Sequence, residues 1–227
     1  MATPTIVFDL DGTLVDTAPD LVGTLNAIFA REGIAPVAYG DARPMIGGGA
    51  RMMLERGLLR EGRSLPREEI DRLVADFIAH YAEHIADASL VFPGLETALD
   101  ALSARGFRLA VCTNKLEWLS VRLLDRLDLA RRFATICGAD TFGISKPNPE
   151  ILRRTVHRAG GAPAAAIMVG DSATDVDTAR AAGIPVIAVD FGYSEIPVAH
   201  TNPDRVIGHY NQLTDAIAAL NLQAERL

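Results

Sequence analysis

The stretch Thr5-Ile6-Val7-Phe8-Asp9-Leu10-Asp11-Gly12-Thr13 joins a short apolar run to two aspartates and an Asp-Gly turn. Two carboxylates so close together repel each other, and burial raises the pKa of one or both unless a cation or a proton compensates. Such oxygen ligands suit a divalent metal. By itself the stretch supports equally a metal site and an ordinary strand that ends in an Asp-Gly turn. The rest of the chain decides between them.

The composition is that of a globular chain with an acidic balance. Of the 227 residues, 49% are hydrophobic and 22% are charged, so the chain can bury a sizeable core. The net charge is −7 without a basic stripe to offset it, so nucleic acid is not an expected partner. The sequence shows neither a secretory leader nor an apolar run long enough for a bilayer, and we expect a cytoplasmic protein without a membrane partner.

Short apolar runs alternate with amphipathic segments over most of the chain. This alternation predicts a doubly wound, Rossmann-like α/β fold around a parallel sheet. Strands are predicted at residues 5–10, 108–112, 135–138, 167–170, 185–189 and, more weakly, 204–207. Helices of this core are predicted at residues 95–105, 116–127, 149–159, 174–182 and 211–219.

Residues 17–90 break the alternation, because apolar residues recur there at helical spacing without a strand pattern. Helices are predicted at residues 21–31, 50–59 and 66–86. A small α-helical cap inserted after the first strand explains this interval and would cover the carboxyl ends of the strands, where open α/β sheets bind ligands. The predicted domains are a core of residues 1–16 and 91–227 and a cap of residues 17–90. Residues 90–94, which end in Pro-Gly, are predicted to form the return linker.

Three further strand ends carry polar residues. Thr113 and Asn114 precede a helix, where phosphate binds well, although an ordinary N-cap explains them too. Lys146 precedes a helix opened by proline, where a cation opposes the dipole unless an anion lies nearby. Asp171 and Asp175 again place carboxylates after an apolar strand. Because parallel strands end at one edge of the sheet, these residues are expected to converge with Asp9 and Asp11 on one crevice.

The order and spacing of these motifs resemble the haloacid-dehalogenase-like phosphohydrolase superfamily over the whole chain. Its four motifs match Asp-x-Asp-Gly-Thr at residues 9–13, Thr113, Lys146, and Gly170-Asp171 with Asp175. The helical insertion resembles the small cap of that superfamily. Three runs resemble the bacterial phosphoglycolate phosphatases more closely: residues 112–115 (Cys-Thr-Asn-Lys), residues 138–141 leading into Lys146-Pro147, and residues 45–49 (Met-Ile-Gly-Gly-Gly). Gly48 is a mild departure from that pattern.

The resemblance implies a Mg²⁺-dependent phosphomonoester hydrolase that forms an aspartyl phosphate and prefers 2-phosphoglycolate. Asp9 is expected to be the nucleophile, since a carboxylate with an unperturbed pKa of about 3.9 is ionised at neutral pH. Asp11 is expected to protonate the leaving alkoxide and later to deprotonate the attacking water. Mg²⁺ is expected to bind Asp9, Asp171 and the backbone carbonyl of Asp11, with Asp175 steadying these ligands.

The resemblance also assigns substrate contacts. Lys146, Thr113 and the N–H of Asn114 are expected to bind the phosphate oxygens. In the cap, Gly48 and Gly49 are expected to bring backbone donors near a small substrate, although a plain flexible loop explains them too. Arg51 is the candidate for reading a second anionic group such as a carboxylate.

Several alternatives stay open at this point. Dehalogenases of the superfamily lack an acid at the position of Asp11, and the absence of lysine from residues 17–90 argues against a phosphonatase that uses a cap lysine. Another small-metabolite phosphatase or a sugar phosphate mutase remains possible on these residues. A phosphoaspartate signalling module would need neither the cap nor Asp11 as an acid/base. The expected partner is a small phosphorylated metabolite, and the apolar cap face allows a monomer or a homodimer.

Overall fold

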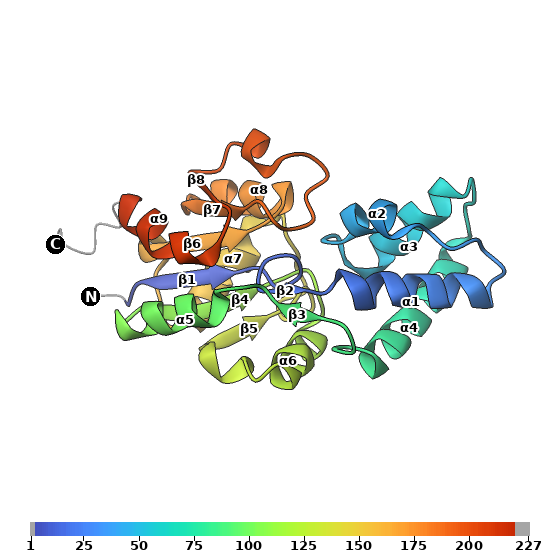
Figure 1. Ribbon diagram of the computed structural model, residues 1–227, viewed down its shortest axis with the longest axis horizontal. Coiled ribbons are helices and arrows are strands. Elements are labelled where there is room, and N and C mark those ends of the chain that lie inside the picture. The colour runs from blue at the N-terminus through green and yellow to red at the C-terminus, as the bar shows by residue number, and fades with distance from the viewer. Residues whose placement is uncertain (1–2, 221–227) are drawn as a thin grey trace.

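The computed structural model describes residues 3–220. The core sheet consists of β1 (Thr5–Phe8), β4 (Arg108–Cys112), β5 (Thr135–Cys137), β6 (Ala166–Gly170), β7 (Val186–Val189) and β8 (Arg205–Ile207). Its strand order is β5-β4-β1-β6-β7-β8, and every pairing is parallel (Figure 1). The predicted parallel α/β sheet is confirmed. Because β1 lies between β4 and β6, the residues that follow these three strands are neighbours at the carboxyl edge.

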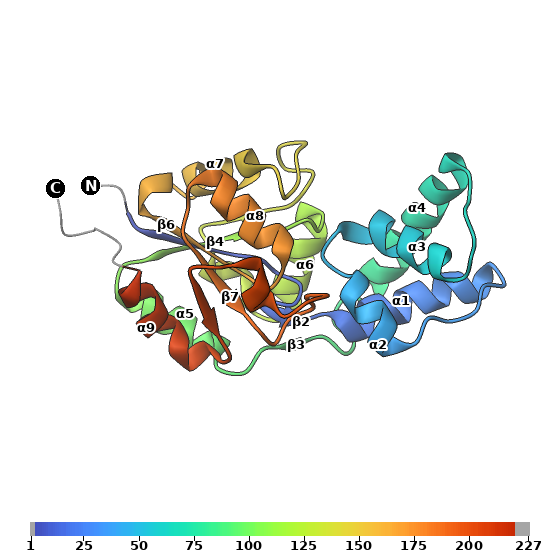
Figure 2. The same cartoon turned by 90° about the horizontal axis from the view of Figure 1, so that it is seen from above.

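Helices cover both faces of this sheet. The helices α5 (Leu95–Ala104), α6 (Glu117–Arg126) and α9 (Leu213–Ala219) pack on one face, and α7 (Pro149–Arg158) and α8 (Ala173–Ala182) pack on the other (Figure 2). Alternate side chains of β1 separate accordingly, because Ile6 and Phe8 belong to the first apolar cluster and Val7 to the second. The double winding that the alternation predicts is therefore present.

Four more helices lie together beyond the carboxyl ends of the strands (Figure 1). They are α1 (Ala18–Arg31), α2 (Tyr39–Ala42), α3 (Gly49–Arg60) and α4 (Arg67–Glu83), and we refer to them as the cap. Their apolar stripes meet in an interior that includes Phe29, Leu54 and Leu73, each at most 1% exposed. Short 3₁₀ turns occur at Arg43–Met45, Ala130–Arg132, Pro163–Ala165, Val198–Thr201 and Tyr210–Gln212.

A two-stranded antiparallel ribbon connects the cap to the sheet, and the sequence patterns do not predict it. The strand β2 (Val15–Asp16) pairs with β3 (Leu90–Val91). The expectation that residues 17–90 contain helices alone is thus wrong at Leu90, and the return linker begins as a strand. Each strand has only two residues, which is too short to show period-two alternation.

Asp20 connects the segment that enters the cap with the segment that leaves it. Its carboxylate accepts hydrogen bonds from the backbone N–H groups of Ala88 and Ser89 and, at 2.6 Å, from the Ser89 hydroxyl. Asp20 lies in the first turn of α1 and is 7% exposed. A buried carboxylate that satisfies several donors fixes the entry of the cap relative to its exit.

The predicted elements are largely correct, with small errors at their ends. The helix expected at residues 66–86 ends at Glu83, and the one expected at 211–219 begins at Leu213 after a 3₁₀ turn. The helix α2 is not predicted at all, because it has four residues. The division into domains at residues 16 and 90 stays a prediction. No helix within residues 3–220 combines the length and the apolar character that crossing a membrane requires.

We predict that Asp20→Ala lowers the free energy of unfolding by roughly 1–3 kcal/mol, because the buried N–H and hydroxyl of Ser89 and the N–H of Ala88 lose their acceptor. Urea denaturation measures the change. The matched control is Asp41→Ala, which removes an exposed partner of Arg60 and is expected to cost less than about 0.5 kcal/mol. Equal effects of the two substitutions would contradict the role given to Asp20.

Candidate metal and phosphate site

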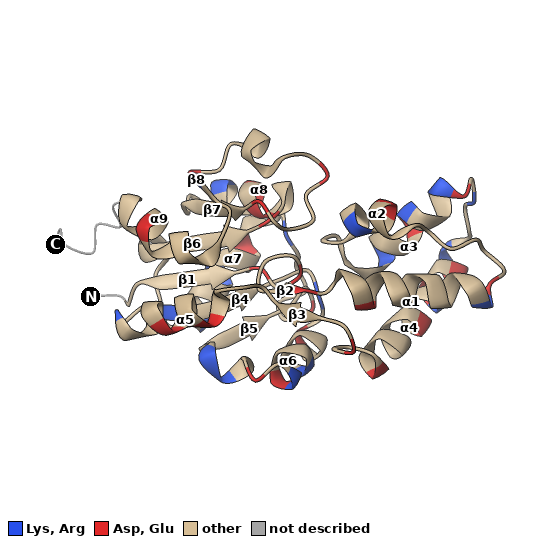
Figure 3. Ribbon diagram, viewed as in Figure 1, with Lys and Arg blue, Asp and Glu red and all other residues tan. Residues whose placement is uncertain are grey.

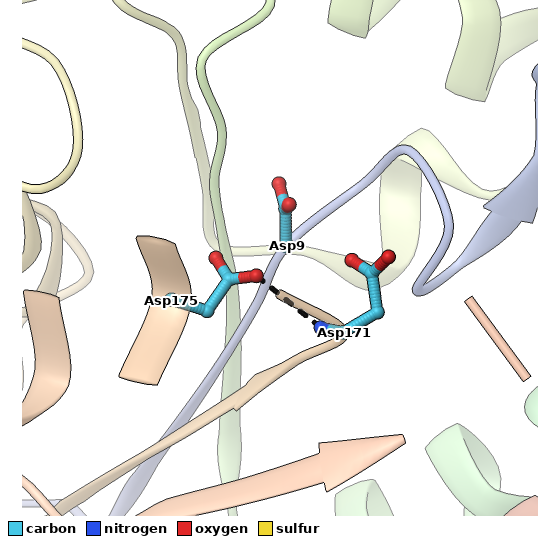
Figure 4. A group of neighbouring side chains, drawn as sticks. All are labelled: Asp9, Asp171 and Asp175. Carbon is cyan, nitrogen blue, oxygen red and sulfur yellow. Dashed lines mark hydrogen bonds between the residues drawn. The ribbon is translucent and has the colours of Figure 1, made fainter. Parts of the chain in front are cut away.

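Three aspartates meet at the carboxyl edge of the sheet. Asp9 follows β1, Asp171 follows β6, and Asp175 lies in the first turn of α8. One carboxylate oxygen from each lies within 4.8 Å of the others, and all three residues are buried. Figure 4 shows Asp9 between Asp175 and Asp171. As the sequence predicts, the aspartates that follow β1 and β6 lie close together at one edge of the sheet.

The Asp171 carboxylate is held from two sides. The Thr13 hydroxyl donates to its Oδ1 at 3.1 Å, and the Tyr193 backbone N–H donates to its Oδ2 at 2.7 Å. The backbone at Gly12 packs closely against the Asp171 carboxylate, since a Cβ at this position would lie only 2.5 Å from Asp171 Oδ2. Gly12 also has a left-handed φ of +80°, so glycine is required there for both conformation and space.

Asp175 already has partners for both of its oxygens. Its Oδ2 accepts from the backbone N–H groups of Asp171 and Ser172 and from the Ser172 hydroxyl, which forms a capping box at the start of α8. Its Oδ1 accepts from Lys146 Nζ at 2.6 Å. These contacts fit the expected supporting role of Asp175 better than a direct metal contact.

Lys146 brings a positive charge to this acidic group. Its Nζ lies 2.9 Å from Asp9 Oδ1, and its side chain is 1% exposed. Burial lowers the pKa of Lys146, but the negative charges of Asp175 and Asp9 outweigh this effect and raise the pKa above its ordinary value. The ammonium therefore stays charged, and Asp9 and Asp175 provide the anion that the sequence pattern requires near Lys146.

The Asp11 carboxylate has a separate set of partners. Thr17 donates its hydroxyl to Asp11 Oδ1 at 2.7 Å. Lys115 Nζ donates to both oxygens, at 2.8 and 3.0 Å. Burial lowers the pKa of Lys115, but the charge of Asp11 outweighs it and raises the pKa above its ordinary value. The two aspartates of the first motif thus lie in different environments, Asp9 with Lys146 and Asp11 with Lys115.

The residues present fit a divalent cation. Among the side chains described above, four carboxylates face two ammonium groups, which leaves two negative charges uncompensated when all are ionised. Burial raises the pKa of Asp171 to about 8, and the charges of Asp175 and Asp9 add to this rise. Burial also raises the pKa of Asp9 to about 6, although Lys146 opposes it. Buried carboxylate oxygens with excess negative charge suit a hard cation such as Mg²⁺.

A cavity of about 200 Å³ opens between this edge and the cap. Its polar wall includes Asp9, Asp11, Thr113, Asn114 and Lys115. The opposite wall comes from the cap and is mostly apolar; it contains Leu21, Ile46, Met53, Val74, Phe77, Ile78 and Tyr81. Residues 47–51, where α3 begins, line the same cavity. The predicted phosphate-binding and cap residues therefore border one space, while Lys146 lies behind Asp9.

The side chains of Thr113 and Asn114, on the polar wall of the cavity, form hydrogen bonds with neighbouring backbone groups. The Thr113 hydroxyl accepts from the Lys115 N–H at 3.2 Å. The Asn114 amide donates to the carbonyls of Gly47 and Lys146 and accepts from the Lys146 N–H at 2.8 Å. Asn114 therefore joins the cap loop to the lysine loop, a function that its sequence position does not reveal.

Arg51 lines the cavity but directs its guanidinium to acidic neighbours within the cap. It pairs with Asp71 of α4 and lies 3.6 Å from Glu55, and its side chain is 43% exposed. Acidic and basic residues both lie on the cap helices around this pair (Figure 3). The carboxylate-reading role of Arg51 stays a prediction.

Three residues at the site have no role in the sequence-based predictions. Lys115 follows Asn114 directly and lines the cavity. Its position just after the end of β4 is the one sequence feature that could have indicated a role at the site. Tyr193 donates its hydroxyl to Asp16 at 2.6 Å and accepts from the Ala18 N–H, so it links Asp171 to the base of the cap. Tyr81 reaches the cavity from α4 and carries no local signal, because its spacing is that of an ordinary apolar helix position.

Comparisons with known proteins agree with this fold and site. Residues 6–189 match the family model of the haloacid dehalogenase-like hydrolases. A phosphoglycolate phosphatase of Mesorhizobium japonicum is 46% identical over 224 residues, 99% of each chain. One of Agrobacterium fabrum is 46% identical over 215 residues, 95% of this chain and 92% of the relative. The crystal structure of a predicted phosphoglycolate phosphatase from Haemophilus somnus has a TM-score of 0.88 at 27% identity, over 94% of this chain and 97% of that one.

The protein is thus a hydrolase with an α/β fold and acidic groups at the carboxyl edge of its parallel sheet. It belongs to the haloacid dehalogenase-like hydrolase family.

We predict that Mg²⁺ raises the melting temperature more at about pH 8.5 than at about pH 6. Burial raises the pKa of Asp171 in the folded protein to about 8, against an ordinary value of 3.8. The folded protein therefore binds more protons than the unfolded chain, and its stability falls as the pH rises through that interval. We expect Mg²⁺ to bind the ionised carboxylates and thereby to reverse this loss. Thermal denaturation with EDTA and with Mg²⁺ measures both effects.

Asp171→Asn is expected to remove most of the Mg²⁺ effect and part of the pH dependence. The matched control is Asp128→Asn, an exposed acid paired with Arg131, which should behave like the wild type. A Mg²⁺ effect of the same size in Asp171→Asn and the control would argue against a metal at this cluster.

Proposed function

We propose that this protein is a Mg²⁺-dependent phosphomonoester phosphatase that forms an aspartyl phosphate on Asp9 and prefers 2-phosphoglycolate. The observation that carries the proposal is the separation of the two aspartates. Asp9 is paired with Lys146 at 2.9 Å, Asp11 with Lys115 at 2.8 Å, and both aspartates border one cavity under the cap. A nucleophile and an acid/base can then act on opposite ends of one phosphate ester bond.

Asp9 acts as the nucleophile. With a pKa of about 6 it is largely ionised at neutral pH and needs no base to activate it. One of its oxygens forms a bond to phosphorus, and the bond from phosphorus to the ester oxygen breaks. Lys146 offsets the charge between Asp9 and the incoming phosphate oxygens, and Thr113 and the Asn114 N–H donate to those oxygens. When bound, Mg²⁺ screens the repulsion between the carboxylates and the phosphate, held by Asp9, Asp171 and the Asp11 carbonyl.

Asp11 acts as the acid and then as the base. It gives a proton to the leaving alkoxide, and in the second step it takes a proton from the water that attacks the phosphorus of the aspartyl phosphate. The products are the alcohol, inorganic phosphate and the restored Asp9 carboxylate. Thr17 and Lys115 hold the Asp11 carboxylate in place between these steps. A dehalogenase would have no use for this second acid.

The substrate class follows from the cavity and from the relatives. The cavity of about 200 Å³ suits a small organic phosphate. The relatives that share 46% identity over nearly the full chain are named phosphoglycolate phosphatases, which supports 2-phosphoglycolate as the preferred substrate. We also propose that the protein works in the cytoplasm as a monomer or a homodimer, as the sequence leads us to expect.

A panel of phosphomonoesters with purified protein and Mg²⁺ tests the proposal. We predict that kcat/KM is highest for 2-phosphoglycolate and at least about tenfold lower for glucose 1-phosphate and glucose 6-phosphate, because the mostly apolar cap wall of the cavity offers few hydrogen-bond partners to the hydroxyl groups of a hexose. Asp9→Asn, prepared in the same way, is expected to be inactive and controls for contaminating phosphatases. Interconversion of the glucose phosphates would instead identify a mutase, and equal turnover of all esters would refute the substrate preference.

Asp11→Asn separates the two aspartate roles. The backbone carbonyl is retained, so Mg²⁺ affinity measured by calorimetry should stay close to that of the wild type. The acid/base is lost, so kcat should fall by about two to four orders of magnitude, with slow breakdown of the phosphoenzyme. Acid-quench experiments with ³²P-labelled substrate measure the phosphoenzyme. A collapse of Mg²⁺ affinity would show that the Asp11 side chain is itself a ligand, contrary to the proposed roles.

A further inference from the structure

The cavity contains a pair of hydrogen-bond donors that the proposed reaction does not use on phosphate. Lys115 Nζ lies 4.5 Å from the centre of the Tyr81 ring, and both residues line the cavity. Lys115 comes from the segment that follows β4 in the core, whereas Tyr81 comes from α4 in the cap. The pair therefore joins the core side of the cavity to its cap side.

The Tyr81 hydroxyl lacks a partner within the described residues. Tyr81 is 1% exposed, and its Oη has no hydrogen-bond partner of ordinary geometry within residues 3–220, although the Lys115 ammonium lies near it. Buried hydroxyl groups without a partner are rare in folded proteins, because such groups normally bind a ligand or a water. The Tyr81 side chain borders the cavity, so a bound molecule that reaches its Oη can supply the missing partner.

We propose that Lys115 and Tyr81 form the subsite that binds the carboxylate of the substrate; this inference rests on the phosphatase function proposed above. An ammonium can only donate hydrogen bonds, and the phenolic hydroxyl donates as well. A carboxylate supplies two acceptor oxygens and a negative charge, whereas a sugar hydroxyl supplies neither the charge nor a second oxygen. The subsite thus selects a carboxylate over a neutral group.

The position of this subsite also limits the length of the substrate. Asp11 must reach the ester oxygen that leaves phosphorus, and Lys115 Nζ is only 2.8 Å from Asp11 Oδ1. A carboxylate bound by Lys115 therefore lies on a carbon close to that ester oxygen, as it does in 2-phosphoglycolate. Arg51 is less well placed for this contact, because its guanidinium is directed to Asp71 and Glu55 within the cap and not to Asp11, and its side chain is half exposed.

The test compares 2-phosphoglycolate with ethyl phosphate, which has a methyl group in place of the carboxylate. The measured quantity is the ratio of their kcat/KM values in each variant, so that general effects on chemistry cancel. We expect Tyr81→Phe to lower this ratio about tenfold and Lys115→Met to lower it about a hundredfold, mainly through KM for phosphoglycolate. Tyr39→Phe, an exposed tyrosine of α2, is the matched control and should leave the ratio unchanged.

Binding to the inactive Asp9→Asn background gives a second readout without turnover. Calorimetry should find tighter binding of 2-phosphoglycolate than of ethyl phosphate, and Tyr81→Phe or Lys115→Met added to that background should remove the difference. Circular dichroism verifies that each variant is folded; Tyr81→Phe loses only an oxygen and keeps the packing of α4.

Failure of the inference and failure of the proposed function differ in these experiments. If the wild type hydrolyses neither ester, the phosphatase proposal fails, while the calorimetric comparison still decides the subsite. If the wild type prefers 2-phosphoglycolate but Tyr81→Phe and Lys115→Met keep that preference, the subsite assignment is wrong. A loss of preference in Arg51→Ala alone would transfer the role to Arg51.

Discussion

Repulsion among buried carboxylates is the constraint on which the rest of this site depends. Asp9, Asp171 and Asp175 have carboxylate oxygens within 4.8 Å of one another, and desolvation disfavours their charged forms. The neighbouring groups reduce this repulsion: Lys146 lies between Asp9 and Asp175, and Thr13 and Tyr193 donate to Asp171. These contacts leave a net negative charge, which suits the binding of a divalent cation.

The parallel sheet brings these charged residues together at one edge. Because β4, β1 and β6 are adjacent and parallel, the residues after each strand end at the same edge, although their sequence positions lie far apart. Helices on both faces bury the strands, so the edge is among the few places where polar side chains can meet. The cap then closes over this edge and provides an apolar wall to the cavity.

Several side chains at the site of the core also contact the cap. Asn114 joins Gly47 of the cap loop to the loop of Lys146, and Tyr193 joins Asp171 to Asp16 and to the start of α1. Lys115 stands against Tyr81 of α4. The cap is thus linked to Asp171 through Tyr193, to the loop of Lys146 through Asn114, and to Asp11 through Lys115, which suits the proposed enzyme, because the site must exclude water around a small substrate.

The sequence by itself determined the strands, the double winding and the helical insertion, because hydrophobic periodicity and strand-end residues are local features of the chain. It also indicated Asp9, Asp11, Lys146 and Asp171 as strand-end residues that converge on one edge. Only the tertiary structure decided their partners. The Asp11–Lys115 pair joins residues 104 positions apart. The Tyr81 hydroxyl, which has no partner of ordinary geometry among the described residues, lies on a helix whose pattern predicts simple packing. Such pairings depend on sheet register and on how the cap sits over the edge, and no local pattern encodes either.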